Sequence, residues 1–443
     1  MTFKHSDSHE KGREHQHKRR FRNLTCKRKG WLLTCKLFAC LGVVFTFSSP
    51  VFSRDSSIPI SFGELPEFAI RNSPEVRIIE QTYNLNVTEG RIDLQWSNPV
   101  ISYSQEFIED DSTEQREQFL TLSKQFEMPW VYSLRRQSWE LQLKAYDYQR
   151  EQKLKNFMSD IKAGYVEIKL VEDQTKRLNG LAKVITDTAE VAKTQLEEGA
   201  ISGIEENLIQ MALSNLNARL LRLEQEKRSL ENEWKTKIGV EETENVQLST
   251  KIDFRPVAIE STDSYLSMIP STPGFLQREK SIDATEKRVK MEQFSLFPNF
   301  NLFGGYKQQD PDFNGFIVGI SLPLPLLNSN KPQIKRQQTE LTLSKNDLFS
   351  YNLRLRNQIK NILTATEAYS TSLERMTPQF NSTQDLIDKT VFSYKEGQIS
   401  LTELLNAIQI YAESIEQYYE QLTSYYRNIF ELEAMLDEQL VTF

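Results

Sequence analysis

The chain has 443 residues, of which 39% are hydrophobic and 26% are charged, with 54 Lys and Arg against 61 Asp and Glu. This density of charge excludes a membrane protein made of apolar helices, which needs segments of roughly 20 apolar residues. The hydrophobic content excludes a wholly disordered chain. Only 16 Gly and 15 Pro interrupt the sequence, which indicates long uninterrupted elements rather than many small domains.

The first 53 residues have the pattern of a secretory signal peptide. A basic run at 18–29 is followed by an apolar segment, Trp31–Phe47, and then by a small-residue cleavage site at Val51-Phe52-Ser53. We expect cleavage after Ser53. Two alternatives stay open: the segment remains as an N-terminal membrane anchor, or Cys40 is lipidated, although the apolar residues that follow Cys40 argue against lipidation.

Histidine and cysteine are confined to this N-terminal segment. All four His and all three Cys lie before residue 41, so a chain cleaved after Ser53 has no disulfide, no Cys or His nucleophile and no His or Cys metal ligand. Cleavage also removes a basic segment and leaves a more acidic chain, which disfavours nucleic acid as a partner. The sequence has no Gly-rich phosphate loop. We therefore predict neither an enzyme nor a cofactor-binding protein.

The rest of the chain consists of two similar halves. The clearest internal repeat is Glu-Gly-x-Ile-Ser, which occurs at Glu198–Ser202 and again about 200 residues later at Glu396–Ser400. We predict a first structural repeat at 54–238, an inter-repeat linker at 239–270 and a second repeat at 271–443. Each repeat is expected to run as a helix, two strands, a long helix, a glycine turn and a helix.

Each repeat contains a pair of strands in which apolar and polar residues alternate over about nine residues, the length of a tilted strand that crosses a bilayer. Two small soluble hairpins with one buried face would show the same alternation. If the strands are transmembrane, four are too few to close a barrel, for which about eight are needed, so two or three chains must share one. The residues predicted to face lipid are Ile101, Tyr103, Leu120, Leu122, Phe300, Leu302, Val318 and Ile320.

The helices carry heptad seams, which are typical of coiled coils. One seam runs from Leu404 to Leu436 in steps of three and four, and another runs from Ile209 to Trp234 with one break at Lys227. A seam of this kind alone indicates a structural bundle more often than a binding site. The long helices predicted at 130–198 and 327–396 are each roughly 100 Å long at 1.5 Å per residue. Each long helix is about as long as two shorter helices placed end to end. For the first the two are expected at 66–97 and 202–238, and for the second at 273–296 and 400–440.

The glycine turns have the chemistry of helix ends. Gly199 and Gly397 suit the left-handed residue that ends a helix. Ser202 and Ser400 are expected to cap the next helix, and each is followed three residues later by a Glu that completes a capping box.

The order, spacing and duplication of these motifs resemble the TolC-like outer-membrane efflux family over essentially the whole mature chain. The resemblance is carried by Pro74-Glu75, Asn98-Pro99, Leu322–Leu326 and the two Gly-x-Ile-Ser turns. It implies a mainly α fold with a small β part. In a homotrimer of this family, four strands per chain build a shared 12-stranded outer-membrane β-barrel, and coiled-coil helices build an α-helical barrel in the periplasm. The implied partners are a periplasmic adaptor and an inner-membrane pump, most simply of the RND type.

The resemblance also implies roles for residues at the turns. The tips expected to contact the adaptor are Gly199, Ile201, Ser202, Gly397, Ile399 and Ser400, and an exposed Ile at a turn fits such a contact. Glu403 matches an acidic position that constricts the periplasmic entrance in relatives, but Asn406 stands where they have a second acidic residue. Glu403 is therefore interpreted either as a pore constriction or only as a helix cap.

The function predicted from these features is a passive exit duct of a tripartite efflux system, for small molecules or metal cations. The alternatives are a periplasmic adaptor, which would show one hairpin and substantial β domains, and a coiled-coil scaffold, which would not need alternating strands. The length and Arg135-Arg136-Gln137 resemble the heavy-metal branch of the family (CzcC-like). Small toxic organic compounds and a polypeptide secreted by a type I system stay open as cargo.

Overall fold

The computed structural model describes residues 58–443 except 111–112, 200, 296–298, 310–312, 325–328, 437 and 442, and the side chains of 108–115 are not described either. The predicted signal peptide, 1–53, lies outside the described residues, as does the cleavage site. Within these ranges the fold is mainly helical with a small part in strands, which confirms the predicted fold class.

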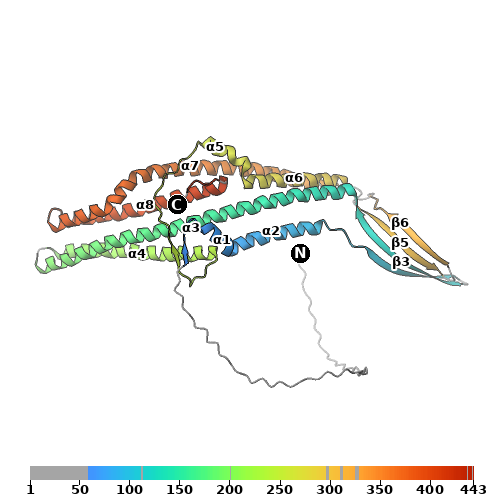
Figure 1. Ribbon diagram of the computed structural model, residues 1–443, viewed down its shortest axis with the longest axis horizontal. Coiled ribbons are helices and arrows are strands. Elements are labelled where there is room, and N and C mark those ends of the chain that lie inside the picture. The colour runs from blue at the N-terminus through green and yellow to red at the C-terminus, as the bar shows by residue number, and fades with distance from the viewer. Residues whose placement is uncertain are drawn as a thin grey trace, which may run out of the picture. The chain divides into compact units, whose positions relative to one another are not determined.

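Two successions of helix, strands and helices follow each other along the chain (Figure 1). The first comprises α1 (Leu65–Asn72), α2 (Pro74–Asp93), β2 (Val100–Asp110), β3 (Thr113–Glu127), α3 (Pro129–Glu197) and α4 (Gly203–Ile238). The second comprises α6 (Pro273–Phe294), β5 (Asn299–Gln309), β6 (Phe313–Ser321), α7 (Lys331–Lys395) and α8 (Leu401–Leu436). The remaining elements are β1 (Ile58–Ile60), β4 (Val246–Leu248), α5 (Thr262–Met268) and the 3-10 turn η1 (Ile269–Ser271).

Prolines and hydroxyl caps explain where several helices begin. Pro74, Pro129 and Pro273 each occupy the first turn of a helix, where the missing N–H costs nothing. Ser73 separates α1 from α2, because its side chain accepts from the N–H groups of Glu75 and Val76. In the described part of the chain no helix is both long and apolar enough to pass through a membrane.

The long helices form an open array around α3. Helices α2 and α4 pack against α3, as do α6 and α8, while α7 packs on α6 and α8 and touches α3 only marginally. The order across the array is therefore α2 with α4, then α3, then α6 with α8, then α7. Among the described residues, its two edges, α2 with α4 and α7, have no further long helix beside them.

The heptad seams predicted for the return helices are confirmed as core positions. All positions of the α8 seam are buried except Tyr411, which is half-buried. In α4, Ile209, Leu223 and Trp234 are among the buried seam residues. The indole N–H of Trp234 donates to the Ile161 carbonyl of α3 at 2.9 Å, so this large side chain fixes the register of the two helices.

The segment predicted as a linker carries structure of its own, which we call the belt (residues 246–268). Its strand β4 pairs in parallel with β1, and α5 packs on α7 through Tyr265 and Leu266. Between β4 and α5 the belt crosses α3 and then α8, so that it links three helices of the array.

Tyrosine hydroxyls hold the extended part of the belt. The Tyr165 hydroxyl of α3 donates to the Ile60 carbonyl and accepts from the Thr250 N–H, both at 3.0 Å. The Tyr425 hydroxyl of α8 donates to the Arg255 carbonyl at 3.0 Å and accepts from Val257 at 2.9 Å. The neighbouring Tyr426 bonds the belt in the same way. Burial raises the pKa of Tyr426 far above its usual range, so this hydroxyl stays protonated as a donor.

Candidate functional site

The four longer strands form one antiparallel sheet in the order β2-β3-β5-β6. The sheet follows the helices directly, because β3 ends at Glu127 and α3 begins at Pro129, and it lies at one end of the helical array (Figure 1). Each of the edge strands, β2 and β6, has one side without a strand partner among the described residues. The hydrogen-bonding groups on these two sides are therefore available to another chain.

One face of this sheet is apolar, and the strand register shows which residues share it. Ile101 lies opposite Leu122, and Leu302 lies opposite Ile320; residues directly opposite in an antiparallel pair lie on the same face. By the same register the eight residues predicted to face lipid all lie on this face. Its side chains are strongly exposed, with Val318 at 85%. Among the eight predicted residues only Phe300 is half-buried, because its ring stacks on that of Phe126 with 5.6 Å between the ring centres. Contact of this face with lipid remains a prediction.

The opposite face is mostly polar. Its residues include Ser102 and Thr121, whose hydroxyls lie 2.6 Å apart, and an ion pair of 2.8 Å between Lys307 and Glu117. A polar face behind a lipid-facing apolar face is the arrangement of a water-filled barrel interior.

Two glycines on the polar face leave room for neighbouring groups. A Cβ on Gly319 would lie 2.3 Å from the ring of Phe303, and a Cβ on Gly305 would lie 2.4 Å from the Leu120 carbonyl oxygen. Close approach of the neighbouring strand therefore explains Gly305, whereas a Cβ on Gly304 would meet nothing nearer than 3.8 Å. Phe303 therefore lies over Gly319 rather than standing out from the sheet.

A group of aromatic and charged residues, not predicted from the sequence, marks the junction between sheet and helices. The Trp96 ring stacks on Tyr132 at 4.8 Å and lies edge-on to Phe126 at 6.3 Å. Arg135 forms an ion pair of 2.6 Å with Glu127 beside a cavity of about 470 Å³. Trp and Tyr just outside predicted membrane strands are the signal that could have revealed this junction.

The glycine turns end the two helical hairpins as predicted. Gly199 and Gly397 have φ of 75° and 71°, and no atom lies within 4 Å of a Cβ built on either. The backbone conformation, not packing, therefore requires glycine here.

Both predicted capping boxes are confirmed. The Glu205 carboxylate accepts from the Ser202 N–H at 2.8 Å, and the Glu205 N–H donates to the Ser202 hydroxyl. Glu403 and Ser400 form the second capping box: the Glu403 carboxylate accepts from the Ser400 N–H at 2.7 Å and from the Ser400 hydroxyl at 2.9 Å. These bonds from Ser400 lower the pKa of Glu403.

The isoleucines of the turns are less exposed than the sequence suggested. Ile201 and Ile399 are half-buried and pack against the helical core, so the turns themselves already give them apolar neighbours. Near the tips, Phe392 of α7 is 60% exposed, and two apolar residues on the first turns of α4 are more exposed still, namely Ile204 at 74% and Met211 at 62%. Their spacing of seven, outside the α4 seam, is the sequence signal for this second apolar stripe.

Glu403 and Asn406 face a groove between the starts of α4 and α8. The groove has a volume of about 600 Å³, and Leu208 and Met211 of α4 line it together with Thr402, Asn406 and Gln409 of α8. The structure thus brings the predicted constriction residues beside an apolar surface of α4. This combination suits contact with an amphipathic partner as well as a cap or a constriction.

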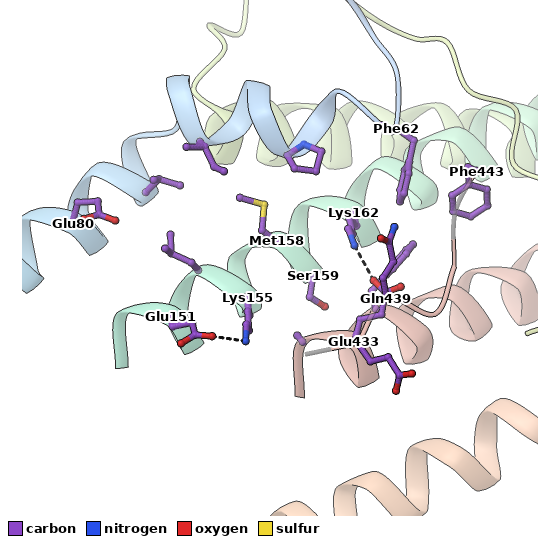
Figure 2. A pocket seen from close by; sticks show the side chains of 18 residues that line it. Phe62, Glu80, Glu151, Lys155, Met158, Ser159, Lys162, Glu433, Gln439 and Phe443 are labelled. Atoms are coloured by element: carbon purple, nitrogen blue, oxygen red, sulfur yellow. Dashed lines mark hydrogen bonds and ion pairs between the residues drawn. The ribbon is translucent and has the colours of Figure 1, made fainter. Parts of the chain in front are cut away.

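A further cavity lies where α1 and α2, α3 and the end of α8 meet, as Figure 2 shows. Its volume is about 790 Å³, and its lining is largely apolar, with Phe62, Met158 and Phe443 among the residues around it. The Lys162 ammonium and the Glu433 carboxylate lie 2.8 Å apart at its edge. Glu433 also accepts from the N–H groups of Leu440 and Val441. These charged groups are engaged in fastening the C-terminal segment to α3.

Comparisons with known proteins identify the fold. No protein-family model matches the sequence, and no curated protein matches it. The outer-membrane channel OprN matches with a TM-score of 0.73 and 13% identity over 85% of this chain and 89% of its own. The outer-membrane protein VceC of Vibrio cholerae matches with a TM-score of 0.71 and 12% identity over 86% and 97%. The MtrE outer-membrane channel of Neisseria gonorrhoeae, in its open state, matches with a TM-score of 0.64 and 13% identity over 86% and 89%.

These matches cover most of each chain. They show that this chain has the fold of TolC-like outer-membrane channels, which confirms the resemblance predicted from the sequence at the level of the fold. They single out no particular branch of the family.

Proposed function

We propose that the protein is the outer-membrane channel of a tripartite efflux system, a passive exit duct that carries small molecules or metal cations from the periplasm to the outside. The observation that carries this proposal is the sheet, whose four strands present a continuous, exposed apolar face and a polar face behind it. A soluble protein rarely leaves such an apolar surface uncovered, whereas lipid covers it without cost. The helical part then lies in the periplasm.

The functional unit is a homotrimer. Four strands cannot close a barrel, and both edges of the sheet and both edges of the helical array are open. The edge helices carry exposed apolar residues that suit contact between copies: Ile78, Leu85 and Ile92 on α2 lie seven residues apart, and Leu343 and Leu353 lie on α7. Three copies of the four-stranded sheet give twelve strands; the number three follows the TolC-like fold rather than the edges themselves.

The partners are a periplasmic adaptor and an inner-membrane pump, of the RND type in the simplest case, and the chain itself performs no catalysis. The adaptor docks on the tips formed by Gly199, Ile201 and Ser202 and by Gly397, Ile399 and Ser400, beside the groove of about 600 Å³. An adaptor or a scaffold role for this chain itself is disfavoured, because neither accounts for the apolar face of the sheet.

Glu403 acts at the periplasmic entrance of the channel. Three copies around a threefold axis would place three carboxylates near the axis, which favours cations, and Asn406 adds a neutral polar group at the next turn. The capping role of Glu403 and this role are compatible, because one carboxylate oxygen serves Ser400 and the other is available to the pore.

The proposal is tested by the native mass of the protein extracted from outer membranes in a mild detergent. We expect a trimer that dissociates on heating and that forms cation-permeable pores in planar bilayers. A monomer or a dimer recovered from the periplasmic fraction would overturn the membrane assignment. A deletion strain tested with metal cations and with small toxic organic compounds then identifies the cargo class by loss of resistance.

A further inference from the structure

One aromatic residue departs from the polar character of the second face of the sheet. Phe303 of β5 lies opposite Ser123 of β3 and opposite Gly319 of β6. It therefore shares the face of the ion pair between Lys307 and Glu117. Positions at which a sequence breaks the local pattern are often functional, so the ring of Phe303 requires an explanation of its own.

Gly319 determines how this ring lies. The three atoms nearest to a Cβ built on Gly319 are Cζ, Cε1 and Cε2 of Phe303, at 2.3, 2.7 and 2.9 Å. The outer half of the ring thus covers the glycine, and any other residue would bring a Cβ into the space that the ring occupies. Phe303 is accordingly half-buried: one side of its ring rests on the sheet, and the other side is turned away from it.

The outward side of the Phe303 ring has no aromatic or cationic partner among the described residues. Neighbouring rings differ in this respect. Phe300 stacks on Phe126, and the Lys307 ammonium lies 5.1 Å from the centre of the Phe119 ring. The free side of an aromatic ring is a surface on which a second planar ring can stack.

Support of the sheet explains only the inner side of this ring. An aromatic ring over a glycine of a neighbouring strand stabilises a sheet, and β6 is an edge strand. A leucine at position 303 would also cover Gly319 with apolar atoms. The stabilising role therefore makes no use of the outward side, which stays open to a ligand.

The surroundings of the ring favour a cation as that ligand. The face of an aromatic ring attracts cations, and the position of Lys307 over Phe119 shows this attraction on the same face of the sheet. The Lys307 ammonium is already engaged with Glu117 at 2.8 Å. Glu106 lies opposite Glu117, is exposed and has no ion pair among the described residues, so one negative charge of this group stays unbalanced.

From these observations we propose that Phe303, held against the sheet by Gly319, is a stacking platform for planar aromatic cations. Gly319 is a positioning residue, because it acts through the ring. The platform selects planar organic compounds over hydrated metal cations, which have no flat surface to stack. Its place in a conducting path rests on the proposed channel function; the platform itself does not.

Fluorine NMR of the full chain in a mild detergent detects stacking without relying on transport. The label, 4-fluorophenylalanine, replaces Phe303 or, in a separate chain, Phe316, which is 89% exposed on the apolar face of the neighbouring strand. The probe is proflavine, a planar aromatic cation. We expect a saturable ring-current shift of the label at 303 and no saturable shift at 316, where the probe reaches the label only through the detergent. A response at 303 that is absent, or equal to that at 316, overturns the proposal.

Two alanine variants test the positioning by Gly319. Gly319→Ala places a Cβ where the ring lies and should displace the ring from the sheet, which weakens proflavine binding although Phe303 is still present. The matched control is Gly315→Ala, on the same strand and the same face, where a Cβ meets nothing within 4 Å, and its binding should equal that of the wild type. Equal binding by the two variants contradicts the role of Gly319.

Phe303→Leu separates stacking from support of the sheet, and it decides the case if Gly319→Ala fails to reach the membrane. Leucine keeps an apolar cover over Gly319, so the amount of protein in the outer membrane should match the wild type. Proflavine, followed by its fluorescence anisotropy, should bind roughly 5–150-fold more weakly, as expected when one aromatic stacking partner is removed. Binding as strong as in the wild type would show that the ring is not the platform.

Channel recordings separate the platform from the proposed channel function. If the wild-type protein conducts in planar bilayers, proflavine should interrupt the current briefly in the wild type and in Gly315→Ala, and much less often in Phe303→Leu. Equal interruption of all three would remove the platform from the conducting path. If no chain conducts, the proposed channel function fails, and the fluorine titration still decides whether Phe303 binds the probe.

Discussion

Replacing Tyr426 by Phe tests whether tyrosine hydroxyls hold the belt on the helices. The substitution keeps the ring, which packs against Tyr425, Phe430 and Phe443, and removes only the hydroxyl. That hydroxyl donates to the Asp253 carbonyl and accepts from the Arg255 N–H at 3.2 Å. Two main-chain groups thus lose a partner, at roughly 1–3 kcal/mol each if they stay buried.

The expected cost is nearer the lower limit. Asp253 and Arg255 are exposed residues, so water reaches part of the freed main chain, and we expect about 1–2 kcal/mol in total. A cost of that size raises the population of the detached belt by roughly 5–30-fold. The double variant Tyr425→Phe/Tyr426→Phe removes the bonds to Arg255 and Val257 as well, and we expect about twice the free-energy change.

Limited trypsin digestion reads out this population, because Lys251 lies in the belt and is exposed. Cleavage after Lys251 should accelerate by the same roughly 5–30-fold when the belt opens and closes faster than trypsin cuts. Tyr132→Phe is the control, since it also removes a tyrosine hydroxyl but one outside the belt contacts. Equal cleavage rates for Tyr426→Phe and the wild type would refute the reasoning, because the hydroxyl would then contribute nothing to holding the belt.

Four further predictions address the membrane face, the tips, the entrance and the helix cap at Glu403. Val318→Arg places a charge on the apolar face of the sheet, at a cost of about 2–4 kcal/mol per chain at mid-membrane, and should lower outer-membrane levels on immunoblots, whereas Ser321→Arg on the polar face should not; equal levels contradict the assigned facing. Ile201→Asp/Ile399→Asp should abolish efflux while the protein still reaches the membrane, and unchanged resistance would remove the tips from the adaptor interface. Glu403→Gln should reduce the cation selectivity of single channels, so that unaltered selectivity leaves Glu403 as a cap alone. Hydrogen bonds from Ser400 lower the pKa of Glu403. The stability that this cap contributes is therefore complete above the pKa of a free Glu and is lost as the pH falls through the lowered pKa. Circular dichroism of the wild type and of Glu403→Gln, recorded as a function of pH, measures this loss as a difference in helix stability.

Periodicity and capping chemistry predicted the helices closely. The first long helix was expected at 130–198 and runs from Pro129 to Glu197, because its end is set by Gly199 and the capping box of Ser202. The strand facing also followed from alternation alone, since a period of two leaves only one way to group the apolar residues.

Of the helix boundaries that were predicted wrongly, two are explained by a proline. The helix expected at 66–97 is divided at Ser73 into α1 and α2, because the residue before Pro74 leaves the helical conformation. The second long helix was expected to begin at Leu327, which lies outside the described residues; α7 begins at Lys331 with Pro332 in its first turn, the position that proline favours.

The belt and the order of the helices could not be read from the sequence. Residues 246–268 show neither a helical nor a strand period, and the tyrosines that hold them lie in other elements, some of them more than 160 positions away. The groove at the tips combines Leu208 of α4 with Asn406 of α8, a neighbourhood that depends on how two hairpins pack. Local patterns carry no information on such contacts between distant segments.

The belt also dictates an order of assembly for the chain. Its bonds join Phe62 to Thr250 and Tyr426 to Asp253, across 188 and 173 positions, while the hairpin of α3 and α4 is made of local contacts. Contacts that close loops of this length form slowly, so the first hairpin should fold early and the belt should dock only after α8 has reached α3. Until then the rings of Tyr425 and Tyr426 lack the belt that covers them, and the partly folded chain exposes them to aggregation or to chaperones during that interval.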